Sequence, residues 1–239
     1  MMKPVIALLV LAYVMPSYSI LRRLANRRDD LTVTQMKIDG LAAVGPSAAR
    51  AAADLLGTEW TSGELSLTAT IYTRFPGRCR VELSSPDSTK TVAAVWAQSK
   101  KRSEGGELPA LTMATEALCA TLALHSGTDG ESRATLERYL GSLKVEMKQV
   151  SFGRFSGAVT FVLGDPADGK PQFWVYKERF LPARLRTADG WDVRFLDYAS
   201  QATGDFWPRL VEVYQGNELK LRLTVLGADE RADLSQVKF

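Results

Sequence analysis

Small or apolar residues recur at every second position over much of this chain, and this period is the feature that most restricts its fold. Alternation of this kind is typical of an antiparallel strand with one covered face and one face in water. The strands of a parallel nucleotide-binding sheet would be continuously apolar instead. The sequence therefore predicts an antiparallel sheet from residue 59 onward. The inward positions of its first strands are Leu65, Leu67, Ala69 and Ile71, then Cys79, Val81 and Leu83, then Val92, Ala94 and Trp96.

The same period returns after residue 145 and continues almost to the end of the chain. Asp189-Gly190 and Gly216-Asn217 are turn signals between neighbouring strands. Strand and turn recur at a spacing of about ten residues, which indicates a meandering sheet. The segments with strand character are 159–163, including Phe161, 173–176, 191–195, including Phe195, 210–214 and 219–225.

Four segments have helical character. Residues 21–30 are amphipathic, and residues 46–57 are rich in alanine and end at a glycine, as helices commonly do. We expect the second segment to belong to an insertion at about 45–58 between two strands. Leucines spaced three and four residues apart predict a helix over 108–122 with one apolar face, and residues 131–143 predict another. The charged segment 100–106 is expected to be a loop.

The N-terminus has the pattern of a secretory signal peptide. Lys3 precedes an apolar run of residues 5–15, Pro16 follows it, and Ser17 and Ser19 supply small residues at a cleavage point. The run is shorter than the ~20 residues that a membrane-spanning helix requires. We therefore expect residues 1–19 to be removed and the mature chain to be exported, with an uncleaved N-terminal anchor as the alternative.

Export changes how the two cysteines are interpreted. Cys79 lies in a predicted strand and Cys119 in a predicted helix, and an oxidising compartment permits a disulfide that joins the two elements. The alternative is that both are small buried apolar residues. The sequence leaves these two readings open.

Composition argues against an enzyme and against a nucleic-acid-binding protein. The chain has one histidine, His125, and its net charge of +3 comes from interspersed charges of both signs. No spacing typical of a catalytic serine, a metal site or a phosphate-binding glycine loop occurs. We expect no cofactor, no metal and no nucleic-acid partner.

The order of these elements resembles the periplasmic outer-membrane lipoprotein carriers, the LolA/LolB-like family. The matching text includes Gly63-Glu-Leu-Ser-Leu, Arg74-Phe-Pro-Gly-Arg-Cys-Arg-Val-Glu and Val193-Arg-Phe-Leu-Asp-Tyr, and the resemblance covers nearly all of residues 20–239. It implies an α+β fold in one domain, in which a single curved antiparallel sheet forms an unclosed β-barrel with helices packed in its concave face. One departure is that Phe75 precedes the turn proline, where carriers of this family have an arginine that holds the helical lid closed. Arg74 lies one residue earlier, so that role is not transferred to it.

The resemblance also implies a function, namely a periplasmic carrier or chaperone that holds lipid or the acyl chains of lipoproteins and delivers them toward the outer membrane. Its partners would then include donor and acceptor proteins at the inner and outer membranes. We interpret the stripe Leu111, Leu118 and Leu122 as the lid. The wall that this lid faces would consist of Leu67, Ile71, Trp96, Phe161 and Phe195.

Three alternatives remain. The leucine stripe is an ordinary permanent core, or the same fold reports the state of envelope lipids to a membrane partner as a sensor or interaction module, or the protein is a secreted hydrolase.

Overall fold

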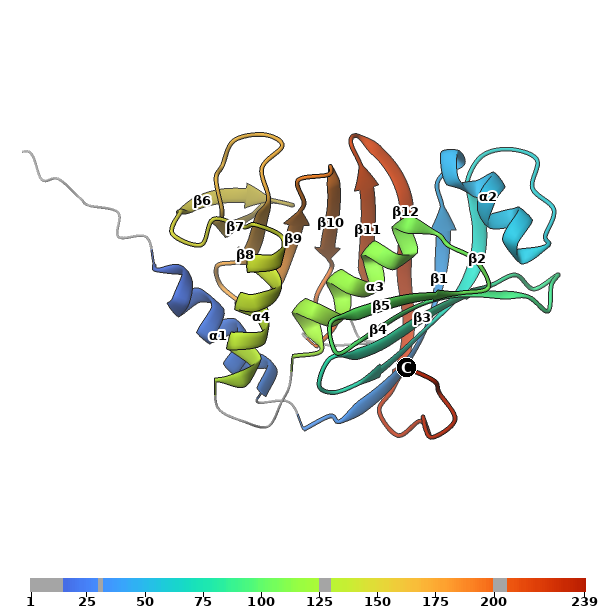
Figure 1. Ribbon diagram of the computed structural model, residues 1–239, viewed down its shortest axis with the longest axis horizontal. Helices are drawn as coiled ribbons and strands as arrows, with labels where there is room; N and C mark the ends of the chain where they lie inside the picture. Colours follow the sequence, from blue (N-terminus) through green and yellow to red (C-terminus); the bar gives the residue numbers. More distant parts are fainter. Residues whose placement is uncertain (1–14, 30–31, 125–129, 200–205) are drawn as a thin grey trace, which may run out of the picture.

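The computed structural model describes residues 15–29, 32–124, 130–199 and 206–239. Within these residues twelve strands form one sheet in the order β5-β4-β3-β2-β1-β12-β11-β10-β9-β8-β7-β6. Each pair of neighbours is antiparallel, and the two end strands β5 and β6 each pair on one side only (Figure 1). The strands are β1 (Gln35–Val44), β2 (Leu65–Arg74), β3 (Arg78–Ser84), β4 (Thr91–Ala97), β5 (Lys100–Glu104), β6 (Val150–Phe155), β7 (Ala158–Leu163), β8 (Gln172–Tyr176), β9 (Pro182–Arg186), β10 (Trp191–Leu196), β11 (Leu210–Gln215) and β12 (Glu218–Asp229).

Four helices accompany the sheet: α1 (Ser17–Asp29), α2 (Pro46–Leu56), α3 (Pro109–Leu122) and α4 (Glu131–Ser142). Helix α3 lies across the concave face and contacts strands from both halves of the sheet, whereas α1 and α4 pack against each other (Figure 1). The predicted α+β fold, with an unclosed curved sheet, is therefore confirmed.

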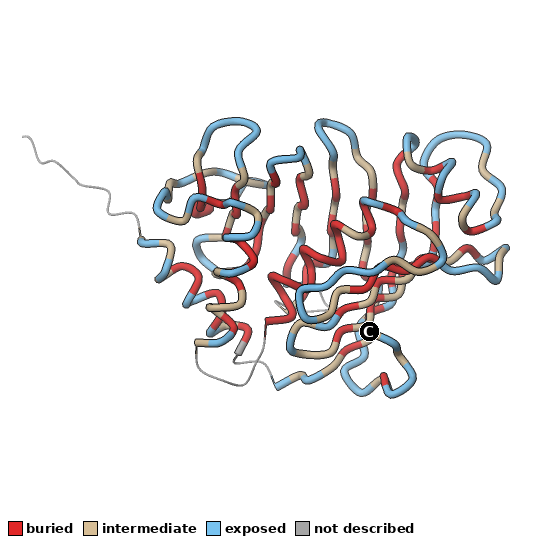
Figure 2. The backbone as a smooth tube through the Cα atoms, in the orientation of Figure 1, coloured by how far each residue is buried: buried red, intermediate tan, exposed pale blue. Residues whose placement is uncertain are grey.

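The residues that alternate between apolar and polar in the sequence alternate between buried and solvent-facing positions in the strands. In β2 every second side chain, from Leu65 to Thr73, is buried, and its neighbours are exposed or half-buried. Residues of β1 and β2 are paired in register from Gln35 opposite Arg74 to Val44 opposite Leu65. This period places one face of each strand in the hydrophobic core, which lies between the sheet and the helices (Figure 2).

Helix α2 follows β1 directly, within the predicted insertion at about 45–58. Pro46 occupies its first turn, and Gly57 ends it with a left-handed backbone, φ 63°. Gly45 enables the abrupt change from strand to helix, because a Cβ there would collide with the backbone carbonyl oxygen of Leu219 in β12.

The expected loop over 100–106 is wrong, because residues 100–104 form β5. Gln98 and Ser99, both with positive φ, make the turn from β4. The strand lacks an apolar period because it is the edge of the sheet, where charged side chains discourage pairing with other chains. Its outward residues Arg102 and Glu104 join Arg80 of β3 in a network of ion pairs.

The proposed signal sequence is described only from residue 15 onward. Helix α1 begins at Ser17, so cleavage after Ser19 would remove its first residues and leave its buried face, which begins at Ile20. Among the described residues no helix is long and apolar enough to cross a membrane.

Candidate functional site

Helix α3 lies against the concave face of the sheet, so its packing determines how much space is left there for a ligand. Every residue from Leu111 to Leu122 except Thr112 is buried, so the helix is covered on all sides rather than on the single face that the sequence predicted (Figure 2). It packs against β3 and β4 on one side and against β9–β12 on the other. In this arrangement α3 fills the interior of the half-barrel.

The C-terminal end of α3 is firmly attached to its surroundings. Cys119 forms a disulfide with Cys79 of β3, with their Cα atoms 5.6 Å apart, a usual separation for this bond. The carbonyl of Ala123 accepts a hydrogen bond of 2.7 Å from the amide of Gly77. The disulfide therefore joins helix to sheet within a small cluster that Phe75 and Trp96 cover.

A buried arginine holds the same end of α3. The Nε of Arg28, near the end of α1, donates to the carbonyl of Leu122 at 2.9 Å, and an Nη donates to the carbonyl of Phe206 at 2.7 Å. The guanidinium also lies 4.8 Å from the centre of the Phe206 ring. Burial lowers the pKa of Arg28 to about 10, and the side chain remains cationic at neutral pH.

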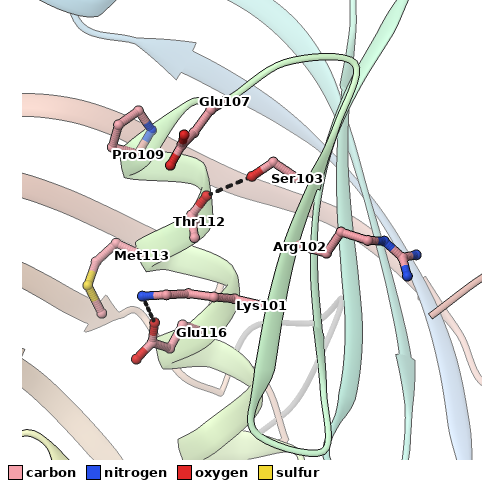
Figure 3. A pocket seen from close by; sticks show the side chains of 8 residues that line it. All are labelled: Lys101, Arg102, Ser103, Glu107, Pro109, Thr112, Met113 and Glu116. Carbon is pink, nitrogen blue, oxygen red and sulfur yellow. Dashed lines mark hydrogen bonds and ion pairs between the residues drawn. The ribbon is translucent and has the colours of Figure 1, made fainter.

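The side of α3 that faces β5 is held to that strand by two long polar contacts, one from the first turn of the helix and one from its middle. The hydroxyls of Ser103 and Thr112 lie 3.4 Å apart, and the ammonium of Lys101 lies 3.4 Å from the carboxylate of Glu116 (Figure 3). The Lys101 side chain is 64% exposed and the Glu116 side chain only 11%. Long, partly solvated contacts of this kind contribute little stability. The two ends of α3 thus differ in their covalent and polar attachment, although Leu111, Ala114 and Thr115 are buried in the first half of the helix as well.

A crevice of about 380 Å³ lies between β5 and this half of α3. Lys101 and Ser103 point across it toward the helix, while Arg102 points away (Figure 3). Its other lining residues are Glu107, Pro109, Thr112, Met113 and Glu116. It therefore offers charged groups of both signs beside an apolar side chain.

A second hollow, of about 610 Å³, lies beside the C-terminal half of α3. The rings of Trp96 and Tyr139 meet edge to face, with centroids 6.0 Å apart, and Ala120 and Leu124 extend this apolar wall. Burial and the nearby Glu116 carboxylate hold the pKa of the Tyr139 phenol well above its ordinary range. The exposed Glu131 and Arg138 of α4 also line this hollow; its size, and an apolar wall that carries a few polar groups, are typical of small-molecule sites.

Most of the predicted site residues lie in one hydrophobic cluster, but around α3 rather than around an empty space. Leu118 and Leu122 are fully buried, and Leu111 borders a hollow of only about 30 Å³. Phe161 stacks on Phe180 near the β6 end of the sheet. Trp96 is the predicted residue that lines the large hollow. The cluster also contains Leu67, Ile71, Phe161 and Phe195.

Sequence reasoning missed Lys101, Glu116 and Arg28. Glu116 is the one charged residue of α3, and a lone carboxylate in an apolar helix was a usable signal. Lys101 was hidden in a segment interpreted as a loop. Arg28 was grouped with the exposed arginines of an amphipathic helix, since nothing local separates it from Arg27.

Groups for metal or acid–base chemistry are sparse in the part of the chain that the structure describes. No set of three His, Cys, Asp or Glu side chains there could hold a metal ion. His125 lies outside the described residues. Asp229, the last residue of β12, and Glu230 after it are both exposed.

Among solved structures, this chain is similar to a LolA superfamily protein of Nitrosomonas europaea, with a TM-score of 0.51 at 9% identity over 94% of this chain and 97% of that one. A DUF1329 family protein of Desulfovibrio piger gives 0.47 at 10% identity over 94% and 98%. The Pseudomonas aeruginosa MucA/MucB complex gives 0.29 at 12% over 89% and 56%. No family model matches the sequence, and no curated protein does. The chain has a LolA-like fold, and at these identities the likeness concerns the fold alone.

Proposed function

We propose that this protein, with its LolA-like fold, is a lipid carrier that exchanges part of α3 for the acyl chains of a lipid or lipoprotein. The observation that carries this proposal is the unequal attachment of α3. Its C-terminal end is bonded covalently to β3, while the rest of the helix is held by core packing and by two contacts of 3.4 Å to the β5 edge. A helix that is bonded covalently at one end, and held at the other only by apolar packing that an acyl chain can replace, is suited to act as a lid.

The direction of opening follows from these attachments. Because Cys119 remains bonded to Cys79, the lid swings about its C-terminal end and parts from β5 at its N-terminal end. Gly105 and Gly106, both with positive φ, lie in the segment that leads from β5 into α3; they allow this segment to turn sharply where other residues would be strained. Cargo would therefore enter between β5 and the first two turns of α3.

The energetics favour reversible exchange. Transfer of an acyl chain out of water gains about 0.8 kcal/mol per methylene, so one long chain gains on the order of 10 kcal/mol before ordering terms. The chain would contact the wall that Leu111 and Leu118 now cover. One apolar surface replaces another, so the net difference is small, and a carrier needs a small difference to release its cargo.

The location and partners belong to the same proposal. Export by a signal peptide of residues 1–19 would place the mature chain in the periplasm, between a donor at the inner membrane and an acceptor at the outer membrane. The fold and the apolar run 5–15 support this placement.

A reversible lock on the lid tests the proposal. The Ser103 and Thr112 hydroxyls are 3.4 Å apart, so Ser103→Cys with Thr112→Cys brings two thiols within reach of a disulfide that pins α3 to β5. We expect the oxidised double variant to take up lipid at least tenfold more slowly than wild type, and mild reduction to restore uptake. The buried native disulfide should resist that treatment. The two single variants are the matched controls.

Native mass spectrometry of protein purified from the periplasm, followed by a transfer assay between vesicles, completes the test. Bound lipid and delivery to acceptor vesicles support a carrier, whereas binding without delivery supports the sensor alternative. A protein that never contains lipid, or a locked variant that takes up lipid at the normal rate, refutes the proposed lid.

A further inference from the structure

The two hollows beside α3 lie end to end along one stripe of that helix. Thr112, Met113 and Glu116 border the charged crevice, and Cys119, Ala120 and Ala123 border the apolar one. These positions follow each other at spacings of three and four residues, which places them on one side of a helix. A molecule that lay along this stripe would have a charged end near β5 and an apolar end near α4.

The β4–β5 hairpin forms the opposite wall of both hollows. Trp96 and Lys101 are directly paired across its two strands, so their side chains stand on the same face of the sheet. Trp96 borders the apolar hollow and Lys101 the charged crevice. The hairpin therefore places an apolar side chain opposite the apolar end of the α3 stripe and a charged side chain opposite its charged end.

The charges in the crevice restrict which headgroup fits. A phosphate that bound Lys101 would withdraw the ammonium from Glu116, the carboxylate of which is largely buried. The Tyr139 phenol would remain beside the Glu116 carboxylate, but a buried charge without a cationic partner is strongly unfavourable, so an anionic headgroup by itself is a poor ligand. A headgroup that also brings an ammonium restores a partner for Glu116. Glu107, on the exposed rim, adds a second carboxylate.

We infer that this stripe binds an amphiphile with a zwitterionic headgroup of the phosphoethanolamine type, its phosphate on Lys101, its ammonium on Glu116 and one acyl chain against Trp96 and Tyr139. The inference rests on the proposed lipid-carrier function and adds the class of headgroup and the position of one chain, both for the closed state in which α3 lies against β5. The hydroxyls of Ser103 and Thr112 are further donors for the phosphate. A primary ammonium donates hydrogen bonds to a carboxylate, which a quaternary choline cannot.

Lysophospholipids with identical chains test the headgroup. We expect lysophosphatidylethanolamine to bind the mature protein at least tenfold more tightly than lysophosphatidylglycerol or lysophosphatidylcholine. Glu116→Gln should remove most of the preference for ethanolamine over glycerol, and Lys101→Met should weaken binding of both. Lys100→Met is the matched control, since Lys100 is the next residue on the strand and points to the other face. If Glu116→Gln does not fold, Lys101→Met against Lys100→Met still tests the site.

Tryptophan fluorescence tests the position of the chain. A lysophosphatidylethanolamine with a brominated acyl chain should quench wild-type emission, and Trp96→Phe should lose most of this quenching, while Trp191→Phe should retain it. Equal affinity for the three headgroups, or undiminished quenching in Trp96→Phe, overturns the inference while the carrier function stands. Failure to bind any lysophospholipid, together with an empty protein from the periplasm, overturns both.

Discussion

Removal of the covalent link between β3 and α3 should cost the protein a large share of its stability. In Cys79→Ala with Cys119→Ala the unfolded chain regains the freedom of a loop whose ends are 40 residues apart. For a closed loop of that length, the chain-entropy relation gives about 13 cal/mol/K, which is about 4 kcal/mol at 25 °C. Both sulfurs are buried, so the small cavities left by alanine add roughly 1 kcal/mol.

Urea denaturation of three samples separates these two contributions. The difference between oxidised and reduced wild type measures the link, and the difference between reduced wild type and the double variant measures packing. We expect the first to be about 4 kcal/mol and the second about 1 kcal/mol. Alkylation of the unreduced protein under denaturing conditions, followed by mass spectrometry, reports whether the thiols are bonded at the start.

The same samples test the role of the disulfide as the fixed end of the lid. Hydrogen exchange of amides near Cys119 should accelerate strongly on reduction, whereas amides near Thr112 should change less because they lie two turns away from the disulfide. A loss below 1 kcal/mol between oxidised and reduced protein, or equal acceleration along the whole helix, would refute the reasoning from loop length and attachment.

Three further substitutions have defined outcomes. Arg28→Met should lower the free energy of unfolding by about 2 kcal/mol, because the loss of two charge-assisted hydrogen bonds outweighs the gain from no longer burying a cation. Arg28→Lys, which keeps the charge, should lose less stability. A Met variant that is more stable than wild type in urea denaturation would contradict this prediction. Asp192 is buried, which raises its pKa, but hydrogen bonds from Arg184 and Arg194 dominate and lower it. The ionised Asp192 carboxylate therefore stabilises the fold above the ordinary pKa of about 4, and this stabilisation is lost as the pH falls. The urea midpoints of wild type and Asp192→Asn should differ most near neutral pH and converge in acid. A difference that stays constant with pH would contradict this prediction. Gly45→Ala should lower stability by about 1–3 kcal/mol in thermal unfolding, since a Cβ has no room against β12. Gly227→Ala is the matched control, because a Cβ there meets nothing within 4 Å and the backbone has no positive φ.

Local patterns in the sequence determined which way each side chain points. The alternation from Leu65 to Ile71 predicted the buried face of β2, and the turn at 216–217 predicted the hairpin of β11 and β12. Alanine-rich residues followed by Gly57 predicted the extent of α2 to within one residue. These predictions succeeded because burial period, turn conformation and helix ends depend on residues that are neighbours in the chain.

The sequence was less informative where a residue owes its role to distant partners. Segment 100–104 has no apolar period, and it is a strand because β4 supplies a hydrogen-bonding edge. Arg28 and Arg27 look alike in sequence, and they differ because only Arg28 reaches the carbonyls of Leu122 and Phe206. The leucine stripe predicted one apolar face of α3, but the strands of both halves of the sheet enclose the whole helix.

The sequence by itself determined an antiparallel α+β protein with a strong amphipathic period and two cysteines in different elements. Only the tertiary structure decided that α3 is enclosed by the sheet, that its two ends are held unequally, and that two hollows of opposite character follow one of its sides. Period and turn chemistry act over a few residues, whereas the attachment of a helix depends on contacts between segments such as 28 and 122, or 101 and 116. Those contacts join segments that are distant in the chain, and they depend on the curved sheet that encloses the helix.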